Sequence, residues 1–230
     1  MANKVIGIEG LVGSGKTSIC RELIKIYPNT VLLNGGNLYR SIVYAMMKNG
    51  SKLEELKSQG KSIDIKEMMD LFKVEIKLEN NETIIYIDGE KVDEDTIQNK
   101  EASMAVSVVG GSADNRKLFA FAHELIDNLK EKHNVIVSGR SVMKIYPECD
   151  KHIFVTASLD ERVKRKAMQY NGEVSLDEIK ENISKRDELQ KQAGFYDFDE
   201  ITEELDVTDC KSVEESTNKF IKLIGENTLS

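Results

Sequence analysis

The chain has 230 residues, 40% of them hydrophobic and 31% charged, which is the composition of a folded soluble protein with one sizeable core. Its formal net charge of −8 argues against a partner made of nucleic acid or an anionic membrane surface. The three cysteines are too widely spaced for a metal-ligand pair, and their odd number is not that of a disulfide framework.

The N-terminal half alternates short apolar runs with helical patterns. Residues 4–9 are typical of a buried parallel strand, a glycine-rich turn follows at 10–16, and apolar residues recur at helical spacing from Thr17. A second short strand is predicted at 30–33 and a helix at 38–48.

The stretch 74–92 has a different pattern. Residues 74–79 alternate strictly between apolar and polar, parts of 83–92 do the same, and Asn80-Asn81 between them favours a hairpin turn. We interpret residues about 60–100 as an insertion that forms a small subdomain.

The rest of the chain returns to the first pattern. It predicts a helix at 114–131, strands at 134–139 and 152–157, charged helices at 159–170 and 176–192, a short strand at 205–207 and a helix at 212–224. Strands that alternate with helices predict one α/β domain, residues 1–230, with a parallel sheet covered by helices on both faces.

One motif carries the chemistry: residues 10–17 fit G-x-x-x-x-G-K-[ST] in full. Glycines let successive backbone N–H groups point at one anion, and the helix behind them adds partial positive charge. Lys16 is expected to reach the β- and γ-phosphates of ATP, and the Thr17 hydroxyl to bind Mg²⁺. The predicted ATP-binding residues are Gly10, Gly13, Ser14, Gly15, Lys16, Thr17 and Ser18.

The alternative is a glycine-rich turn with a chance lysine, but the strand before the loop and the helix after it weigh against that. The motif alone does not separate a kinase from a GTPase or an ATPase. Arg40 and Arg140 each follow a glycine-bearing loop after a strand, at the expected ligand edge of the sheet. Guanidinium groups there favour a phosphorylated acceptor, although any single arginine also fits a solvated surface charge.

With these features the chain resembles the bacterial cytidylate kinases, nearly end to end. The segments that carry the resemblance, besides the glycine-rich loop, are LNGGNLYR (33–40), IDGEKVDEDTI (87–97), VSVVGGSADNRKLF (106–119), VIVSGRS (135–141), KHIFVTASLDERVKRK (151–166), KRD (185–187) and DVTDCKSVEES (206–216). The family fold implies that the inserted hairpin belongs to a monophosphate-binding subdomain and that residues about 160–190 form a helical lid.

Residue roles follow from the resemblance position by position. It assigns the acceptor pocket to Tyr39, Arg40, Ser107, Arg116 and Arg140. It places Arg162 and Arg165 at the start of the lid and Arg186 and Asp187 on its return helix, near the transferring phosphate, so that the catalytic set is these four with Lys16 and Arg140.

The chain also departs from the family pattern. Family members usually carry a hydroxyl residue at Gly35, an acid at Ser138 and another at Ser141, and an Asp and an Arg at the positions of Gln190 and Ala193. Several acceptor contacts are therefore missing, whereas the ATP side is intact. Since the acid before Gly139-Arg140 is replaced by Ser138, Glu9 becomes the candidate for holding a metal-bound water.

The expected activity is transfer of the γ-phosphoryl group of ATP to CMP or dCMP, with Mg²⁺. Two alternatives stay open: a kinase of the same fold with another acceptor, such as a nucleoside, and a nucleotide-binding regulator with little turnover. The apolar run after Lys4 is too short for a signal peptide, and no stretch approaches the roughly 20 residues of a membrane span. We expect a cytoplasmic monomer that binds small nucleotides and neither nucleic acid nor membrane.

Overall fold

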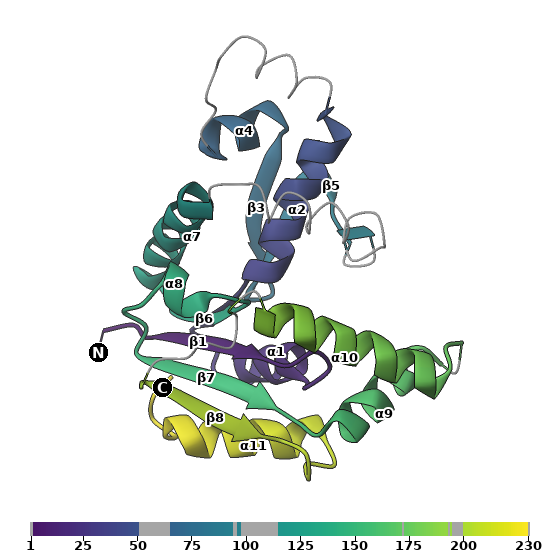
Figure 1. Ribbon diagram of the computed structural model, residues 1–230. Helices are drawn as coiled ribbons and strands as arrows, with labels where there is room; N and C mark the ends of the chain where they lie inside the picture. The colour runs from purple at the N-terminus through teal and green to yellow at the C-terminus, as the bar shows by residue number, and fades with distance from the viewer. Residues whose placement is uncertain are drawn as a thin grey trace.

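A computed structural model describes residues 2–50, 65–93, 96–97, 115–171, 173–192, 194 and 200–229. An eight-stranded sheet runs through the molecule in the order β3-β4-β2-β6-β1-β7-β8, with β5 paired to β4 (Figure 1). The strands are β1 (Val5–Gly10), β2 (Thr30–Asn34), β3 (Val74–Glu79), β4 (Glu82–Ile87), β5 (Glu90–Lys91), β6 (Asn134–Ser138), β7 (Lys151–Thr156) and β8 (Thr202–Asp206).

Helices connect and cover these strands. They are α1 (Lys16–Ile26), α2 (Gly35–Lys48), α4 (Ile65–Leu71), α7 (Asn115–Lys130), α8 (Val142–Ile145), α9 (Leu159–Gln169), α10 (Leu176–Gln192) and α11 (Val213–Ile224). The pairs that join β2, β6, β1, β7 and β8 are all parallel. The predicted α/β architecture is therefore confirmed. No helix in the described ranges is both long and apolar enough to cross a membrane.

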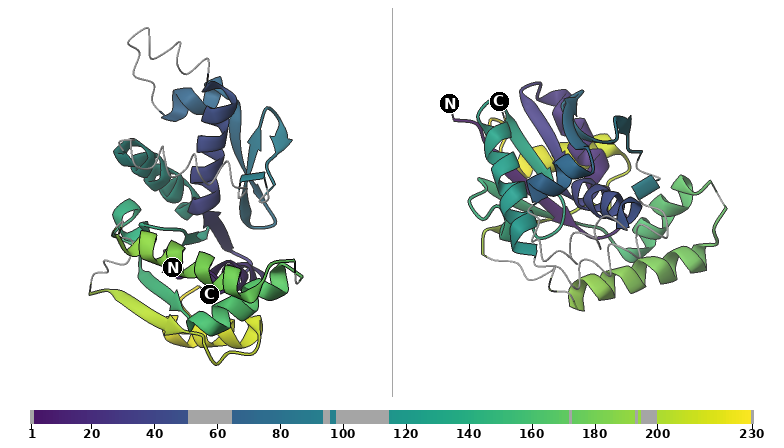
Figure 2. Two further views of the ribbon diagram at one scale, coloured as in Figure 1. Left: turned by 45° about the vertical axis from the view of Figure 1, so that its right-hand side comes forward. Right: turned by 90° about the horizontal axis from the view of Figure 1, so that it is seen from above.

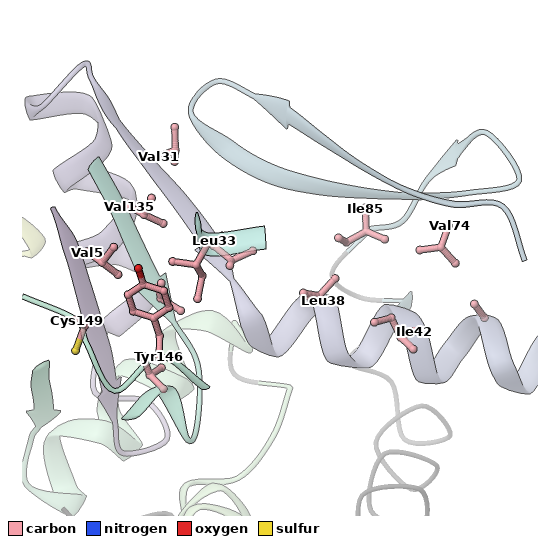
Figure 3. Packing of buried hydrophobic residues seen from close by; sticks show 14 of the residues in the cluster. Val5, Val31, Leu33, Leu38, Ile42, Val74, Ile85, Val135, Tyr146 and Cys149 are labelled. Carbon is pink, nitrogen blue, oxygen red and sulfur yellow. The ribbon is translucent and has the colours of Figure 1, made fainter. Parts of the chain in front are cut away.

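Alternate residues of the central strands enter two hydrophobic cores. Ile6 of β1 and Ile136 of β6 face α1 and α11, whereas Val5 and Val135 face α2, α7 and α8. A parallel strand buried on both faces needs apolar side chains at successive positions, which is why these strands read as continuous apolar runs. Figure 3 shows the core that contains Val5 and Val135, here called the second core. Side chains of α2 extend this core toward the hairpin formed by β3 and β4.

The hairpin predicted at 74–92 is present and continues the main sheet. β3 and β4 pair antiparallel from Val74 with Ile87 to Glu79 with Glu82, and Asn80 and Asn81 both have positive φ, as a tight hairpin turn requires. β4 also adjoins β2 through a parallel bridge between Leu32 and Glu82. The hairpin thus extends the sheet edge beside α2 (Figure 1). Within the predicted insertion, residues 60–64, 94–95 and 98–100 lie outside the described residues.

The two charged helices predicted at 159–170 and 176–192 form as α9 and α10. They lie side by side, and their connecting turn extends from one side of the sheet (Figure 2). Val163, Ile179 and Ile183 pack with Val12 of the glycine-rich loop in a small hydrophobic cluster of their own. This cluster brings the helix pair against the loop that follows β1.

Candidate active site

The loop after β1 has the backbone geometry of an anion-binding site. Gly10 has φ 152°, and a Cβ there would lie 2.1 Å from the Val155 carbonyl oxygen, so only glycine fits beside β7. Gly15 has φ 96° and precedes the first residue of α1, which is Lys16. The loop therefore ends in a helix N-terminus, whose N–H groups and dipole favour a phosphate.

The ammonium of Lys16 lies over this loop. Its Nζ donates hydrogen bonds to the carbonyl oxygens of Gly10 at 2.7 Å and Leu11 at 2.9 Å. Burial lowers the pKa of Lys16 to about 8, and the positive charges of Arg140 and Arg186 act in the same direction. Arg186 also adds to the effect of burial in lowering the pKa of Lys166. Positive charges from the loop, from the turn after β6 and from α9 and α10 therefore influence one another, as at a site for several phosphates.

Arg162 and Arg165 bind the same loop through its carbonyl groups. Arg162 is 5% exposed and donates from Nη1 to the Val12 oxygen and to Asp187 Oδ2, at 3.2 and 2.6 Å. Arg165 donates from Nη1 to the Ser14 oxygen at 3.1 Å, and from Nη2 to two carbonyls of the turn after β8.

These contacts give the two arginines a defined place in the structure. A loop whose N–H groups point at an anion must direct carbonyl oxygens elsewhere, and both guanidinium groups satisfy those oxygens. Through Asp187 the loop is also tied to α10. The direct contact of Arg162 and Arg165 with the transferring phosphate, which the resemblance implies, stays a prediction, as does that of Arg186.

The acceptor-side arginines lie at one edge of the sheet. β2 and β6 pair in parallel up to Asn34 with Ser138, so α2 with Arg40 and the turn with Arg140 begin at neighbouring strand ends. Asn34 Oδ1 accepts a hydrogen bond from the Asn37 N–H and caps α2. The interpretation of Arg40 and Arg140 as edge residues is therefore supported by the strand pairing.

The other predicted acceptor residues are less fully described. Tyr39 lies on α2, and burial raises the pKa of its phenol. Arg116 lies in the first turn of α7, but its side chain, like all of Ser107 and Ala193, is outside the described residues. Gln190 is buried on α10.

Ser138 occupies the strand end where the family usually carries an acid. It is buried, as is the nearby Cys20 thiol. Burial raises the pKa of that thiol to about 12, although Ser138 acts in the opposite direction, so Cys20 stays neutral. The place of a carboxylate beside Lys16 is thus taken by two uncharged groups.

The donor set suits a magnesium ion that is held mainly by substrate phosphates and water. In the part of the chain that the structure describes, no three His, Cys, Asp or Glu side chains cluster as metal ligands. The buried Ser14 hydroxyl has no hydrogen-bond partner among the described residues, which fits a loop built for a phosphate or its hydration shell. Mg²⁺ needs few protein ligands, and Thr17 and Glu9 stay the predicted ones.

Glu9 has contacts that the sequence did not reveal. Its carboxylate accepts hydrogen bonds from the backbone N–H groups of Ser141 and Val142, and His152 lies beside it at 3.3 Å. A lone histidine in an otherwise apolar strand, at His152, is the only signal of this contact in the sequence, because Glu9 lies far away along the chain.

Comparison with known proteins gives consistent matches over the whole chain. A family model described as cytidylate kinase matches residues 6–226. The cytidylate kinase of Aquifex aeolicus (strain VF5) is 28% identical over 232 residues, covering 98% of this chain and 97% of the relative. That of Clostridioides difficile (strain 630) is 29% identical over 233 residues, covering 98% and 100%. A crystal structure of an uncharacterized protein from Eubacterium ventriosum shares the fold, with TM-score 0.50, 14% identity and coverage of 96% and 98%.

Proposed function

The chain belongs to the cytidylate kinase family, and we propose from this that it transfers the γ-phosphoryl group of ATP to CMP or dCMP. The products are ADP and CDP or dCDP. The observation that carries the proposal is the mutual influence of the charges of Lys16, Arg140 and Arg186 beside the glycine-rich loop, at the sheet edge where α2, the helix that carries Arg40, also begins. An ATP hydrolase would need Lys16 beside the donor phosphates, but it would not need further arginines to bind the phosphate of an acceptor.

Phosphoryl transfer asks the protein for positioning and charge neutralisation rather than for covalent chemistry. The N–H groups of residues 10–18 bind the donor phosphates, and Lys16 leaves its carbonyl partners to contact the β- and γ-phosphates. Arg40 and Arg140 hold the acceptor phosphate, with Tyr39, Ser107 and Arg116 completing the pocket as in the family. Bound Mg²⁺, held by Thr17 with Glu9 behind it, would neutralise phosphate charge.

The α9–α10 pair acts as a lid in this proposal. Arg162 and Asp187 join the two helices to each other and to the Val12 carbonyl, so a movement of the helices and a change in the loop are mechanically linked. Closure of residues about 160–190 over the phosphates brings Arg186 to the transferring group and excludes water, which suppresses hydrolysis of ATP.

The altered acceptor positions predict weaker nucleotide binding than in typical family members. A charged hydrogen bond is worth about 1.5–3 kcal/mol, so the loss of an Asp and an Arg at Gln190 and Ala193 should raise the KM for CMP about tenfold or more. A Cβ at Gly35 would meet only the Ser138 oxygen at 3.6 Å, so crowding does not explain the absence of a side chain there. We expect less discrimination between ribose and deoxyribose.

We expect a monomer in the cytoplasm, and the charge of −8 argues against binding to nucleic acid. Light scattering on the purified protein measures the first of these properties.

The test of function is steady-state kinetics with a panel of acceptors at fixed Mg-ATP. The panel holds CMP, dCMP, UMP, dTMP, AMP, cytidine and deoxycytidine, and removal of Mg²⁺ with a chelator should stop turnover. We expect CMP or dCMP to give the highest kcat/KM. If a nucleoside exceeds every monophosphate, the arginine pocket does not bind an acceptor phosphate. If nothing is phosphorylated while ATP still binds, the protein is not a nucleotide kinase.

A further inference from the structure

Behind the turn that carries Arg140 lies a chain of polar side chains from three neighbouring strands: the buried Glu9 and His152, and the half-buried Thr202. We propose that His152 and Glu9 are positioning residues, which hold the backbone of residues 140–142 and thereby aim Arg140 at the acceptor phosphate. The inference rests on the proposed function for the identity of the acceptor, but its geometry is independent of it.

The turn itself is held in an unfavourable backbone conformation. Ser141 has φ 57°, in the left-handed region that residues with a Cβ avoid. Its N–H and that of Val142 donate to the two carboxylate oxygens of Glu9, at 3.2 and 2.5 Å. Helix α8 begins here and has only four residues. The two hydrogen bonds to Glu9, which is far away in the sequence, therefore hold the start of this helix.

Glu9 is itself held from behind. It is only 4% exposed, and a buried carboxylate requires donors around it. His152 lies directly behind this carboxylate, with its Nε2 3.3 Å from Glu9 Oε1, a close polar contact rather than an aligned hydrogen bond. His152 is fully buried on β7, and its Nδ1 lies 2.8 Å from Thr202 Oγ1 on β8. When the Thr202 hydroxyl donates to Nδ1, the ring hydrogen is on Nε2, the nitrogen nearer to Glu9.

The packing around His152 is built for an imidazole ring. Gly7 of β1 pairs with His152, and a Cβ on Gly7 would lie 2.8 Å from both His152 Cδ2 and Val142 Cγ1. The ring thus fills the space that glycine leaves between β1, β7 and α8. A ring confined in this way cannot turn aside, so packing sets the position of Nε2 beside Glu9.

Arg140 is the residue next to this fixed backbone. The Gly139 N–H before it donates to the Ile8 oxygen of β1 at 3.2 Å, so Arg140 leaves the turn beside the strand end from which the glycine-rich loop also starts. The charge of Arg140 contributes to the lowered pKa of Lys16. Releasing the N–H groups of Ser141 and Val142 would let the backbone relax from its left-handed conformation. The guanidinium would then move relative to Lys16, while the loop that binds ATP, on the other side of Gly10, keeps its own bonds to β7.

The first test compares His152→Leu with His152→Gln. Leucine fills the space without a donor, whereas the glutamine amide keeps an N–H near the position of Nε2. We expect His152→Leu to lower kcat/KM for CMP about tenfold and to change the KM for ATP by less than about twofold, with His152→Gln recovering most of the loss. If His152→Leu impaired kcat/KM for CMP and KM for ATP equally, or if His152→Gln recovered none of the loss, His152 would have only a structural role.

A double-mutant cycle with Arg140→Ala tests whether His152 acts through Arg140. If it does, His152→Leu has no further effect on kcat/KM for CMP once Arg140 is removed. Independent losses that multiply would overturn the proposal. Glu9→Gln should reproduce the His152→Leu loss in kcat/KM for CMP, because it weakens the same two backbone hydrogen bonds. A fall in Mg²⁺ affinity without a change in kcat/KM for CMP would instead make Glu9 a metal-site residue only.

A crystal structure of each variant without substrate gives a result that does not depend on the acceptor. The proposal expects residues 140–142 to relax in His152→Leu, and an unchanged turn would overturn it even if CMP is the true acceptor. If the wild-type protein phosphorylates no nucleotide, the proposed function is wrong. The conformation of residues 140–142 in the variants still tests whether His152 and Glu9 hold the turn. Thermal unfolding measures whether each variant is folded. If His152→Leu does not fold, Thr202→Val replaces it, because this variant removes only the partner of His152 Nδ1.

Discussion

Lys16 donates to two carbonyl groups of its own loop and packs against neither hydrophobic core, so its side chain is placed for a ligand rather than for stability. Lys16→Ala should therefore keep its fold and retain less than about a tenth of the wild-type turnover, because it loses a charge that stabilises the transferring phosphate. Turnover of the purified variant and its thermal unfolding measure both properties. Lys25→Ala, exposed at the other end of α1, is the matched control and should behave as wild type.

The lowered pKa of Lys16 predicts a pH dependence of ATP binding. Burial, and then Arg140, lower that pKa to about 8, so the ammonium is present below this pH and is lost as the pH rises through it. The dissociation constant for ATP should therefore rise above pH 8, by up to about tenfold per pH unit if only the ammonium form binds. Calorimetric titrations between pH 7 and 9.5 measure it. Lys16→Met should show no such rise, and a flat wild-type profile would contradict the prediction.

At the scale of elements, the buried pair of Arg162 and Asp187 decides how α9, α10 and the loop are joined. The arginine is 5% exposed and also binds two carbonyl oxygens, so its removal leaves a largely buried carboxylate without its cation. Arg162→Ala should lower the free energy of unfolding by about 3 kcal/mol. Urea unfolding of the purified variant measures this loss.

The same two helices offer a control for this prediction. Lys180 and Asp160 form an ion pair at 3.3 Å, with side chains 52% and 88% exposed. An exposed pair of this kind contributes about 0–1 kcal/mol, so Asp160→Ala should be nearly neutral. A similar cost for both variants would mean that the Arg162 contacts add no stability beyond a surface charge.

The elements also explain why α2 can carry the acceptor arginine. Leu38 and Ile42 face the hairpin residues Ile85 and Val74 in the second core (Figure 3). Arg40 lies between them in the sequence, on another face of the helix. The hairpin therefore fixes the rotation of α2 and, through it, the direction in which Arg40 leaves the helix.

For the whole molecule, the central strands hold the two cores together. Ile136 is fully buried in the middle of the sheet and packs toward α1 and α11. Ile136→Ala should lower the free energy of unfolding by about 2–5 kcal/mol, because the side-chain carbons that it removes leave a cavity that the packed core cannot fully close. Leu78→Ala on β3, where the side chain is 43% exposed, should cost far less in the same urea experiment. If both variants lost a similar free energy of unfolding, burial in the middle of the sheet would contribute no more to stability than an exposed position on β3.

The sequence by itself determined the features that depend on neighbours along the chain. The glycine spacing of residues 10–17, the strand before it and the helix after it identified the phosphate loop, because a left-handed turn and a helix start are local properties. The alternating pattern and Asn80-Asn81 identified the hairpin for the same reason. Family resemblance predicted an acceptor pocket, and the parallel pairing of β2 and β6 brings the elements that carry Arg40 and Arg140 to one edge of the sheet.

Only the tertiary structure decided which distant groups meet. Arg162 and Arg165 look like lid residues in the sequence, yet their guanidinium groups bind carbonyls of a loop that lies about 150 positions earlier. Glu9 meets the N–H groups of Ser141 and Val142 because β1 is inserted between β6 and β7, and His152 joins them because β7 pairs with β1 in a register that sets the ring against Gly7. Strand order and register are properties of the whole sheet, since each depends on the packing of every helix that covers it.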